Sequence, residues 1–247
     1  MEIIKAKEKE RPFLDELAAK QVSRRKFMSW AGVLGATATV AGLATSCSKD
    51  DDDNNNNNNN NTGVDLGSGD VGILNYAYAL EQLEAAFYTQ VVAHASFSTN
   101  FSADERMLLT DIRDHEIAHR EFFKNAITAA APTKIIPGLE VNFSSINFGS
   151  KASVLGTAMA FEDLGVSAYD GAGYLIQDVN YLLLAGKIVS VEARHAAYIR
   201  EVSAVNTFLG DQVDANSVNI SRTPAEVLAI AGTYITTKIN ASNLPTG

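Results

Sequence analysis

Residues 115–119 read HEIAH and residues 191–195 read VEARH, so the pattern Glu-x-x-His occurs twice in the chain. Each copy follows one of two further segments that resemble each other: residues 79–88 read ALEQLEAAFY, and residues 160–169 read AFEDLGVSAY. Both of these segments contain a Glu that is followed seven residues later by a Tyr. The chain therefore contains an internal repeat, in which a segment with one Glu precedes a segment with Glu-x-x-His.

Long helices are expected around both copies of the repeat. Residues 71–131 and 151–223 contain no proline, and apolar residues recur at helical spacing from Leu74 to Val92. Ser102 and Glu105 form a capping box, which marks the start of a helix. We therefore predict four long helices, over residues of about 74–92, 102–130, 151–177 and 180–205.

The regions between and after these helices carry different signals. Residues 131–150 contain two prolines and no convincing strand pattern, so we expect an extended crossover between the second and third helices. Thr223 and Glu226 form another capping box, with Pro224 at the first helical position. This pattern predicts a short C-terminal helix that ends near Lys238.

Helical geometry places several polar side chains on shared faces. Residues three apart lie about one turn apart on a helix, and residues seven apart lie about two turns apart on the same face. Because the neighbouring residues are mostly apolar, these faces are expected to point into the protein. The side chains concerned are Glu81, Tyr88, Glu116, His119, Glu162, Tyr169, Glu192 and His195.

Four buried carboxylates need compensation, because a charge that is removed from water without a partner is very costly. Two divalent cations would balance four carboxylates, and two imidazoles supply nitrogen ligands that suit Fe, Mn or Zn. The sequence thus contains the donors of a carboxylate-bridged dinuclear site. The alternative is a metal-free hydrogen-bond network made by the same side chains.

The order Glu…Glu-x-x-His…Glu…Glu-x-x-His resembles the ligand pattern of ferritin-like di-iron or di-manganese carboxylate proteins. Residues 160–172 also resemble an exported bacterial branch of ferritin-like domain proteins, and the resemblance covers about residues 70–210. It implies an all-α fold, namely a ferritin-like four-helix bundle with a long crossover between helices 2 and 3, here followed by the short C-terminal helix.

The resemblance also implies a role for each ligand. Glu81 and Glu162 would be terminal ligands, and Glu116 and Glu192 would bridge the two metals. The two histidines, His119 and His195, would each bind one metal. The implied cofactors are two Fe or Mn ions.

Several residues near this predicted site remain open to more than one interpretation. Glu84 is an alternative metal ligand because it lies one turn from Glu81, but its counterpart in the repeat is Gly165. Tyr88 and Tyr169 would either hydrogen-bond a ligand carboxylate or relay electrons, or they would simply pack in the core. His115 should face away from the site, either exposed or between helices. Candidate partners that would orient the histidines are Asp111, Asp114 and Asp163.

The N-terminal residues indicate export. Residues 23–28 read SRRKFM and precede a weakly apolar stretch, which resembles a twin-arginine signal, although a retained anchor helix is the alternative. Cys47 follows in a context that resembles a lipoprotein cleavage box, and an ordinary cleavage site is the alternative. We expect a signal region over 1–46, a disordered Asp/Asn-rich tether over 47–69 and the bundle over 70–247. The predicted location is the periplasm or the cell surface, with a lipid anchor in the membrane.

Composition narrows the remaining function classes. Of the 247 residues, 46% are apolar and only one is cysteine, which excludes a disulfide scaffold and a cysteine-based zinc site. Residues 47–247 carry a net charge of −12, which disfavours nucleic acid as a partner. We expect an exported di-metal protein that reacts with oxygen, peroxide or ferrous iron, and a homodimer is the expected form of association. The alternative is a metal-free structural or interaction module.

Overall fold

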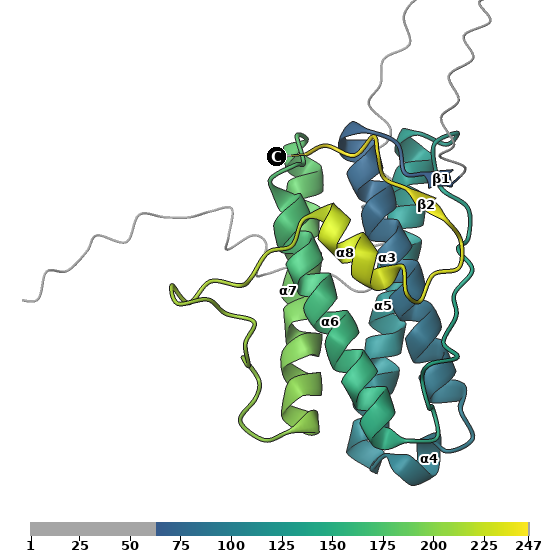
Figure 1. Cartoon of the computed structure of the whole chain (residues 1–247), viewed down its shortest axis with the longest axis vertical. Helices are drawn as coiled ribbons and strands as arrows, with labels where there is room; N and C mark the ends of the chain where they lie inside the picture. The colour runs from purple at the N-terminus through teal and green to yellow at the C-terminus, as the bar shows by residue number, and fades with distance from the viewer. Residues whose placement is uncertain (1–62, 247) are drawn as a thin grey trace, which may run out of the picture. The chain divides into compact units, whose positions relative to one another are not determined.

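A computed structural model describes residues 63–246, and four long helices dominate it (Figure 1). They are α3 (Gly69–Ala93), α5 (Ala103–Ala130), α6 (Lys151–Gly173) and α7 (Val179–Ser203). Two shorter helices, α4 (Phe97–Asn100) and α8 (Pro224–Ala231), complete the helical part. The prediction of an all-α four-helix bundle is confirmed.

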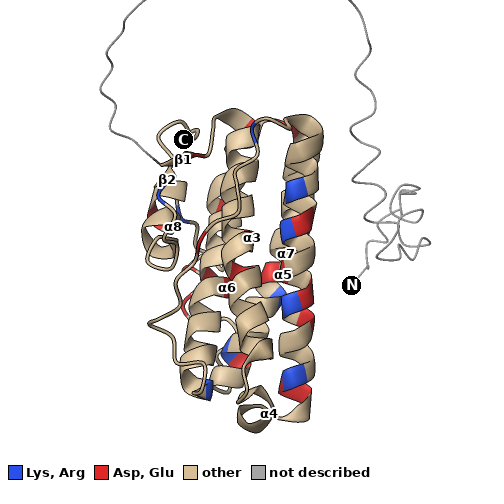
Figure 2. Cartoon of the chain, turned by 90° about the vertical axis from the view of Figure 1, so that its right-hand side faces the viewer, with Lys and Arg blue, Asp and Glu red and all other residues tan. Residues whose placement is uncertain are grey.

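The four long helices form two pairs that are joined by the crossover. α3 packs mainly against α5, and α6 packs mainly against α7, while α3 and α6 connect the two pairs. Residues 131–150 run along the bundle from the end of α5 to the start of α6, so that α3 and α6 are antiparallel (Figure 1). The charged positions visible in Figure 2 lie mostly along α5, whereas α3 and α6 carry fewer of them. This difference agrees with the deeper burial of α3 and α6.

The helix boundaries follow the predicted capping signals at their starts. Ser102 accepts a hydrogen bond from the Glu105 backbone, and the Glu105 carboxylate accepts one from the Ser102 backbone. Thr223 and Glu226 form the same reciprocal pair at the start of α8. The predicted end of this helix near residue 238 is wrong, because α8 ends at Ala231. Glycine and β-branched residues are poor helix formers, and the chain passes through turns over residues 232–234 to the bridge residue Ile235.

The residues after α8 form a small sheet with the start of the folded part. Strand β2 (Ile239–Asn240) pairs in parallel with β1 (Val64–Asp65), and Leu66 is fully buried. Residues 63–69 therefore belong to the folded unit, so the predicted boundary between tether and bundle lies a few residues too late. The rest of the tether, Cys47 and the signal region lie outside the described residues.

Aromatic side chains hold the crossover and the C-terminal segment on the bundle. Phe143 and Phe148 of the crossover contact Phe87 of α3, with ring centroids 6.0 and 5.9 Å apart. Tyr234 packs edge-on against Phe161 of α6 at 4.9 Å. These contacts close one side of the bundle with apolar surface. Within residues 63–246, none of the helices is long and apolar enough to span a membrane.

We expect the substitution Gly171→Ala to destabilise the fold by about 1–3 kcal/mol. Residue 171 lies on α6, where an added Cβ would come within 1.8 Å of the Arg222 carbonyl oxygen. That segment is held by hydrogen bonds from Arg222 to Ser167, so it cannot move without losing them. The free energy of unfolding in urea measures the loss.

The matched control is Gly156→Ala on the same helix, because Gly156 is exposed and an added Cβ meets no atom within 4 Å. Alanine favours the helical conformation, so this variant should be more stable than the parent by about 0.5–1 kcal/mol. Equal effects of the two substitutions would contradict the close packing at Gly171.

Candidate metal centre

Six side chains that the sequence predicted to point inward converge inside the bundle. α3 and α6 each contribute one Glu, while α5 and α7 each contribute a Glu and a His that lie one turn apart. The four glutamates are fully buried, with relative exposures of 0%. The six residues are Glu81 on α3, Glu116 and His119 on α5, Glu162 on α6, and Glu192 and His195 on α7.

These side chains form two overlapping groups, and each group has the donors for one metal ion. The potential ligand atoms within each group lie within 4.8 Å of one another. Glu116 and Glu192 belong to both groups, as two carboxylates that bridge a pair of ions would. The first group comprises Glu81, Glu116, His119 and Glu192, and the second comprises Glu116, Glu162, Glu192 and His195.

In the first group, the His119 ring nitrogen is directed at three carboxylates. Its Nδ1 atom lies 2.7 Å from Oε1 of Glu192, 3.6 Å from Oε2 of Glu81 and 3.7 Å from Oε2 of Glu116. One nitrogen among three carboxylate oxygens is the donor set that Fe or Mn accepts.

The second group repeats this arrangement around His195. Its Nδ1 atom lies 2.9 Å from Oε1 of Glu116, 3.4 Å from Oε2 of Glu162 and 3.5 Å from Oε2 of Glu192. The two imidazole ring centroids are 6.5 Å apart, so both histidines face one shared region.

Most of the polar atoms in this region lack a hydrogen-bond partner. Within the described part of the chain, eight buried atoms of the six residues are unpaired, although ring nitrogens and oxygens come within a few ångströms of one another. Buried polar atoms in native proteins are almost always paired, so a cluster of this size needs an explanation. Divalent cations fit it, because each ion would satisfy several of these atoms at once. The unpaired atoms are Oε2 of Glu81 and Glu162, both oxygens of Glu116 and Glu192, and Nδ1 of His119 and His195.

The electrostatics of the metal-free cluster are strongly perturbed. Burial, together with the negative charge of Glu192, raises the pKa of Glu116 to about 8. Burial also tends to raise the pKa of Glu192, but the interactions with His119 and His195 outweigh it and lower that pKa to about 2. Burial opposes protonation of both histidines, yet the surrounding carboxylates raise the pKa of each well above its usual value. Without metal, protons on Glu116 and on the two histidines therefore offset part of the negative charge of the cluster.

Two tyrosines hydrogen-bond the carboxylates of Glu81 and Glu162 from the opposite helix. Tyr88 on α3 donates a hydrogen bond to Oε1 of Glu162 on α6, and Tyr169 on α6 donates one to Oε1 of Glu81 on α3. Because the helices are antiparallel and each Tyr lies two turns beyond its own Glu, the pairs form reciprocally. Each of these carboxylates thus has one oxygen fixed by a tyrosine and the other directed into the cluster.

Glu84, the alternative ligand, belongs to neither group. It is buried, and its carboxylate packs against Gly165, where an added Cβ would lie 3.1 Å from Oε1 of Glu84. Burial raises the pKa of this carboxyl group well above its usual value. The glycine in the second copy of the repeat therefore makes room for the extra carboxyl group of the first copy.

The aspartates that were candidates for orienting the histidines lie elsewhere. Asp163 binds Arg200 with oxygen-to-nitrogen distances of 2.9 and 2.5 Å, Asp114 pairs with Arg113, and Asp111 is exposed. His195 is instead contacted by His115, whose Nδ1 lies 2.9 Å from Nε2 of His195. The contact agrees with the expectation of an interhelical His115, but spacing within one helix does not reveal which residue of another helix it meets.

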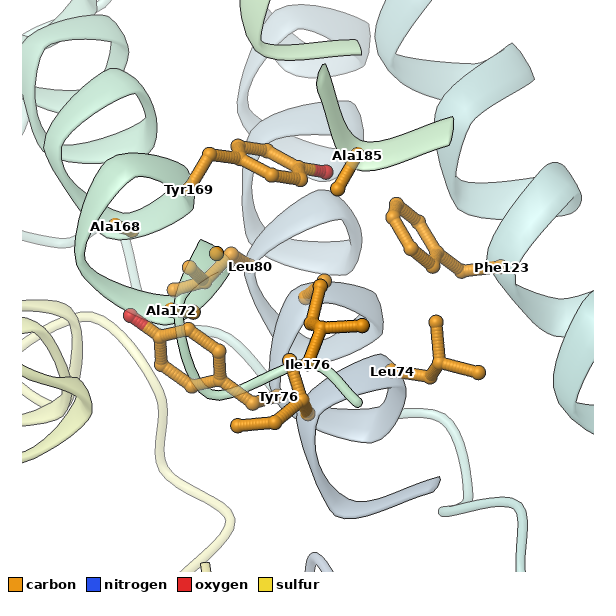
Figure 3. Close-up of a pocket in the computed structure, with 12 residues that line it drawn as sticks. Leu74, Tyr76, Leu80, Phe123, Ala168, Tyr169, Ala172, Ile176 and Ala185 are labelled. Atoms are coloured by element: carbon orange, nitrogen blue, oxygen red, sulfur yellow. The ribbon is translucent and has the colours of Figure 1, made fainter. Parts of the chain in front are cut away.

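Apolar side chains close the region next to Tyr169. A small pocket of about 20 Å³ lies there, with Leu74, Phe123 and Ile176 around it and the Tyr169 ring above them in the view of Figure 3. Its surface is almost entirely apolar, so this side of the cluster offers water few partners. Charges in such surroundings interact more strongly than in water.

We expect the metal-free protein to lose stability as the pH rises from about 5 to about 8. In that range the folded state keeps the proton on Glu116, whose pKa is about 8, whereas the unfolded chain releases it near 4.5. The folded state then binds more protons, so rising pH favours unfolding. The raised pKa values of Glu84 and Glu162 act in the same direction.

Urea unfolding of chelator-treated protein at pH 5 and pH 8 measures this effect. The lowered pKa of Glu192, about 2, adds stability only as the pH rises toward 4.5, and so it does not reverse the trend in this range. A metal-free protein that is more stable at pH 8 than at pH 5 would contradict the retention of a proton on Glu116 in the folded state.

The comparison with known proteins agrees with this geometry. A family model described as a ferritin-like domain matches residues 69–204, which include all four long helices and all six residues of the cluster. A search of curated proteins finds no significant match. On the strength of the match, the bundle and the buried carboxylate and histidine cluster, the chain belongs to the ferritin-like domain family.

Proposed function

We propose that this protein binds two Fe or Mn ions in the bundle. The observation that carries the proposal is the convergence of eight buried, unpaired donor atoms from six side chains. Glu116 and Glu192 would bridge the ions, because they alone belong to both groups. Glu81 and His119 would complete the ligand set of one ion. Glu162 and His195 would complete the ligand set of the other ion.

The chain's own residues prepare this site before an ion arrives. Tyr88 and Tyr169 each hold one oxygen of a terminal carboxylate, which leaves the other oxygen free to bind. The surrounding helices supply the rigid support that keeps such ligands in place. The protons that neutralise the metal-free cluster would leave when the ions bind, because metal ligands must be deprotonated.

We also propose redox chemistry at this centre. Two ions held by these six residues would supply two electrons, one each on passing from the +2 to the +3 state, which with two protons would convert one hydrogen peroxide to two water molecules. Tyr169 lies between the cluster and the small apolar pocket, and the apolar surroundings limit access of bulk water. Dioxygen and ferrous iron are the other candidate substrates of the same centre.

We expect the purified protein to bind about two equivalents of Fe(II) in the absence of oxygen. The double substitution Glu116→Ala with Glu192→Ala should abolish this binding, because it removes both shared carboxylates. It should leave the protein folded, since the loss of two buried carboxyl groups removes their desolvation cost while Glu81 and Glu162 remain beside the two histidines. Calorimetric titration measures the binding, and circular dichroism measures the fold.

The matched control is Glu121→Ala, which removes a partly exposed carboxylate from the same helix as Glu116. It should bind as many ions as the parent. Absence of Fe(II) binding by the parent, with no optical change on addition of oxygen or peroxide, would overturn the proposal. That result would favour a metal-free structural or interaction module that keeps the bundle.

We further propose that the protein is exported by the twin-arginine route and anchored by lipid at Cys47. The supporting observations are the sequence patterns over residues 23–28 and around this single cysteine. The Asp/Asn-rich segment would separate the anchor from the bundle as a solvated spacer. Pairing of two bundles as a homodimer stays a prediction.

We expect the substitution Cys47→Ser to release the protein from the membrane fraction, because it removes the only thiol that could carry a lipid. The neighbouring substitution Ser48→Ala should leave it membrane-bound. Fractionation of cells that express each variant, followed by detergent extraction, separates the two outcomes. A Cys47→Ser variant that stays in the membrane fraction would contradict lipidation.

A further inference from the structure

His115 makes a direct contact between two helices at the edge of the candidate centre. It lies immediately before Glu116 on α5 and is only partly buried. Its Nδ1 atom lies 2.9 Å from Nε2 of His195 on α7. The ring planes differ by 10°, and the ring centroids are 5.2 Å apart. The two ring centroids are farther apart than the two nitrogens by about two ring radii. The rings therefore meet edge to edge, and the two nitrogens lie between the ring centres.

The other nitrogen of His195 determines the direction of this hydrogen bond. Nδ1 of His195 faces the carboxylates of Glu116, Glu162 and Glu192, and it must be free of hydrogen to bind a metal ion. The neutral ring then carries its hydrogen on Nε2. His195 therefore donates from Nε2, and Nδ1 of His115 accepts.

The internal repeat shows that this contact is not shared by the two halves of the centre. In the alignment of residues 115–119 with 191–195, the counterpart of His115 is Val191. A valine side chain has no atom that can accept a hydrogen bond. The two Glu-x-x-His segments thus supply the same ligands, but only the first supplies an acceptor for the histidine of the other segment.

We propose that His115 is a positioning residue for His195 and makes the two metal positions unequal. An acceptor on the outer nitrogen fixes the ring orientation and its protonated nitrogen, and it makes the ligand nitrogen more basic. The ion beside His195 is therefore held more tightly than it would be without His115. The ion beside His119 does not depend on this contact. This inference rests on the proposed binding of two metal ions.

The test compares two substitutions at the same position. His115→Val copies the residue found in the other half of the repeat and removes the acceptor. His115→Asn keeps an acceptor, because its side-chain oxygen can take the place of the imidazole Nδ1. We expect His115→Val to weaken the affinity for one Fe(II) ion by about 10- to 100-fold and to leave the affinity for the other ion unchanged. His115→Asn should restore most of that loss.

Two readouts separate this inference from the proposed function. Anaerobic calorimetric titration with Fe(II) gives the two affinities, and failure of the parent to bind Fe(II) would overturn the proposed function. Proton NMR of the metal-free protein follows the Nε2 hydrogen of His195, which should be protected from exchange in the parent and in His115→Asn but not in His115→Val.

Three results would overturn the positioning role. One is His115→Val with both Fe(II) affinities and the Nε2 signal as in the parent. Another is an equal loss of Fe(II) affinity at both metal positions in His115→Val. The third is the same loss in His115→Val and His115→Asn, since a role in packing alone does not depend on a hydrogen-bond acceptor.

Discussion

The compensation of four buried carboxylates is the constraint on which the rest of this structure depends. Glu81, Glu116, Glu162 and Glu192 have no exposed surface, and they lie within a few ångströms of one another. Without compensation, their mutual repulsion and lost hydration would oppose folding. The two histidines and the shifted pKa values supply compensation by protons in the metal-free state. Two divalent ions would supply it more completely, because they would also pair the remaining donor atoms.

The internal repeat supplies the residues of this cluster in two equivalent sets. Each half supplies a helix with one Glu and one Tyr and a second helix with Glu-x-x-His. When α3 and α6 meet in antiparallel orientation, the Tyr of each half reaches the Glu of the other. The halves have also diverged, since Glu84 corresponds to Gly165 and His115 corresponds to Val191. The symmetric residues form the cluster, and the asymmetric residues make its two sides chemically different.

The order of the repeated residues implied the four-helix bundle through its resemblance to ferritin-like proteins. Helical spacing placed the six side chains on faces that point inward, because burial on one face follows from periodicity. It did not predict which residues meet across helices. The hydrogen bonds of Tyr88 and Tyr169 and the contact of His115 with His195 depend on how helices pack together. The pairing of β1 with β2 was missed for a similar reason, since it joins strands from opposite ends of the folded part.

Anomalous X-ray diffraction from crystals of the purified protein, recorded at the iron and manganese absorption edges, tests the central claim most directly. We expect two peaks about 3.5–4 Å apart between Glu116 and Glu192, one beside His119 and the other beside His195. Crystals grown with Fe(II) or Mn(II) present that show no peak there, with the carboxylates paired to one another or to the histidines, would contradict it.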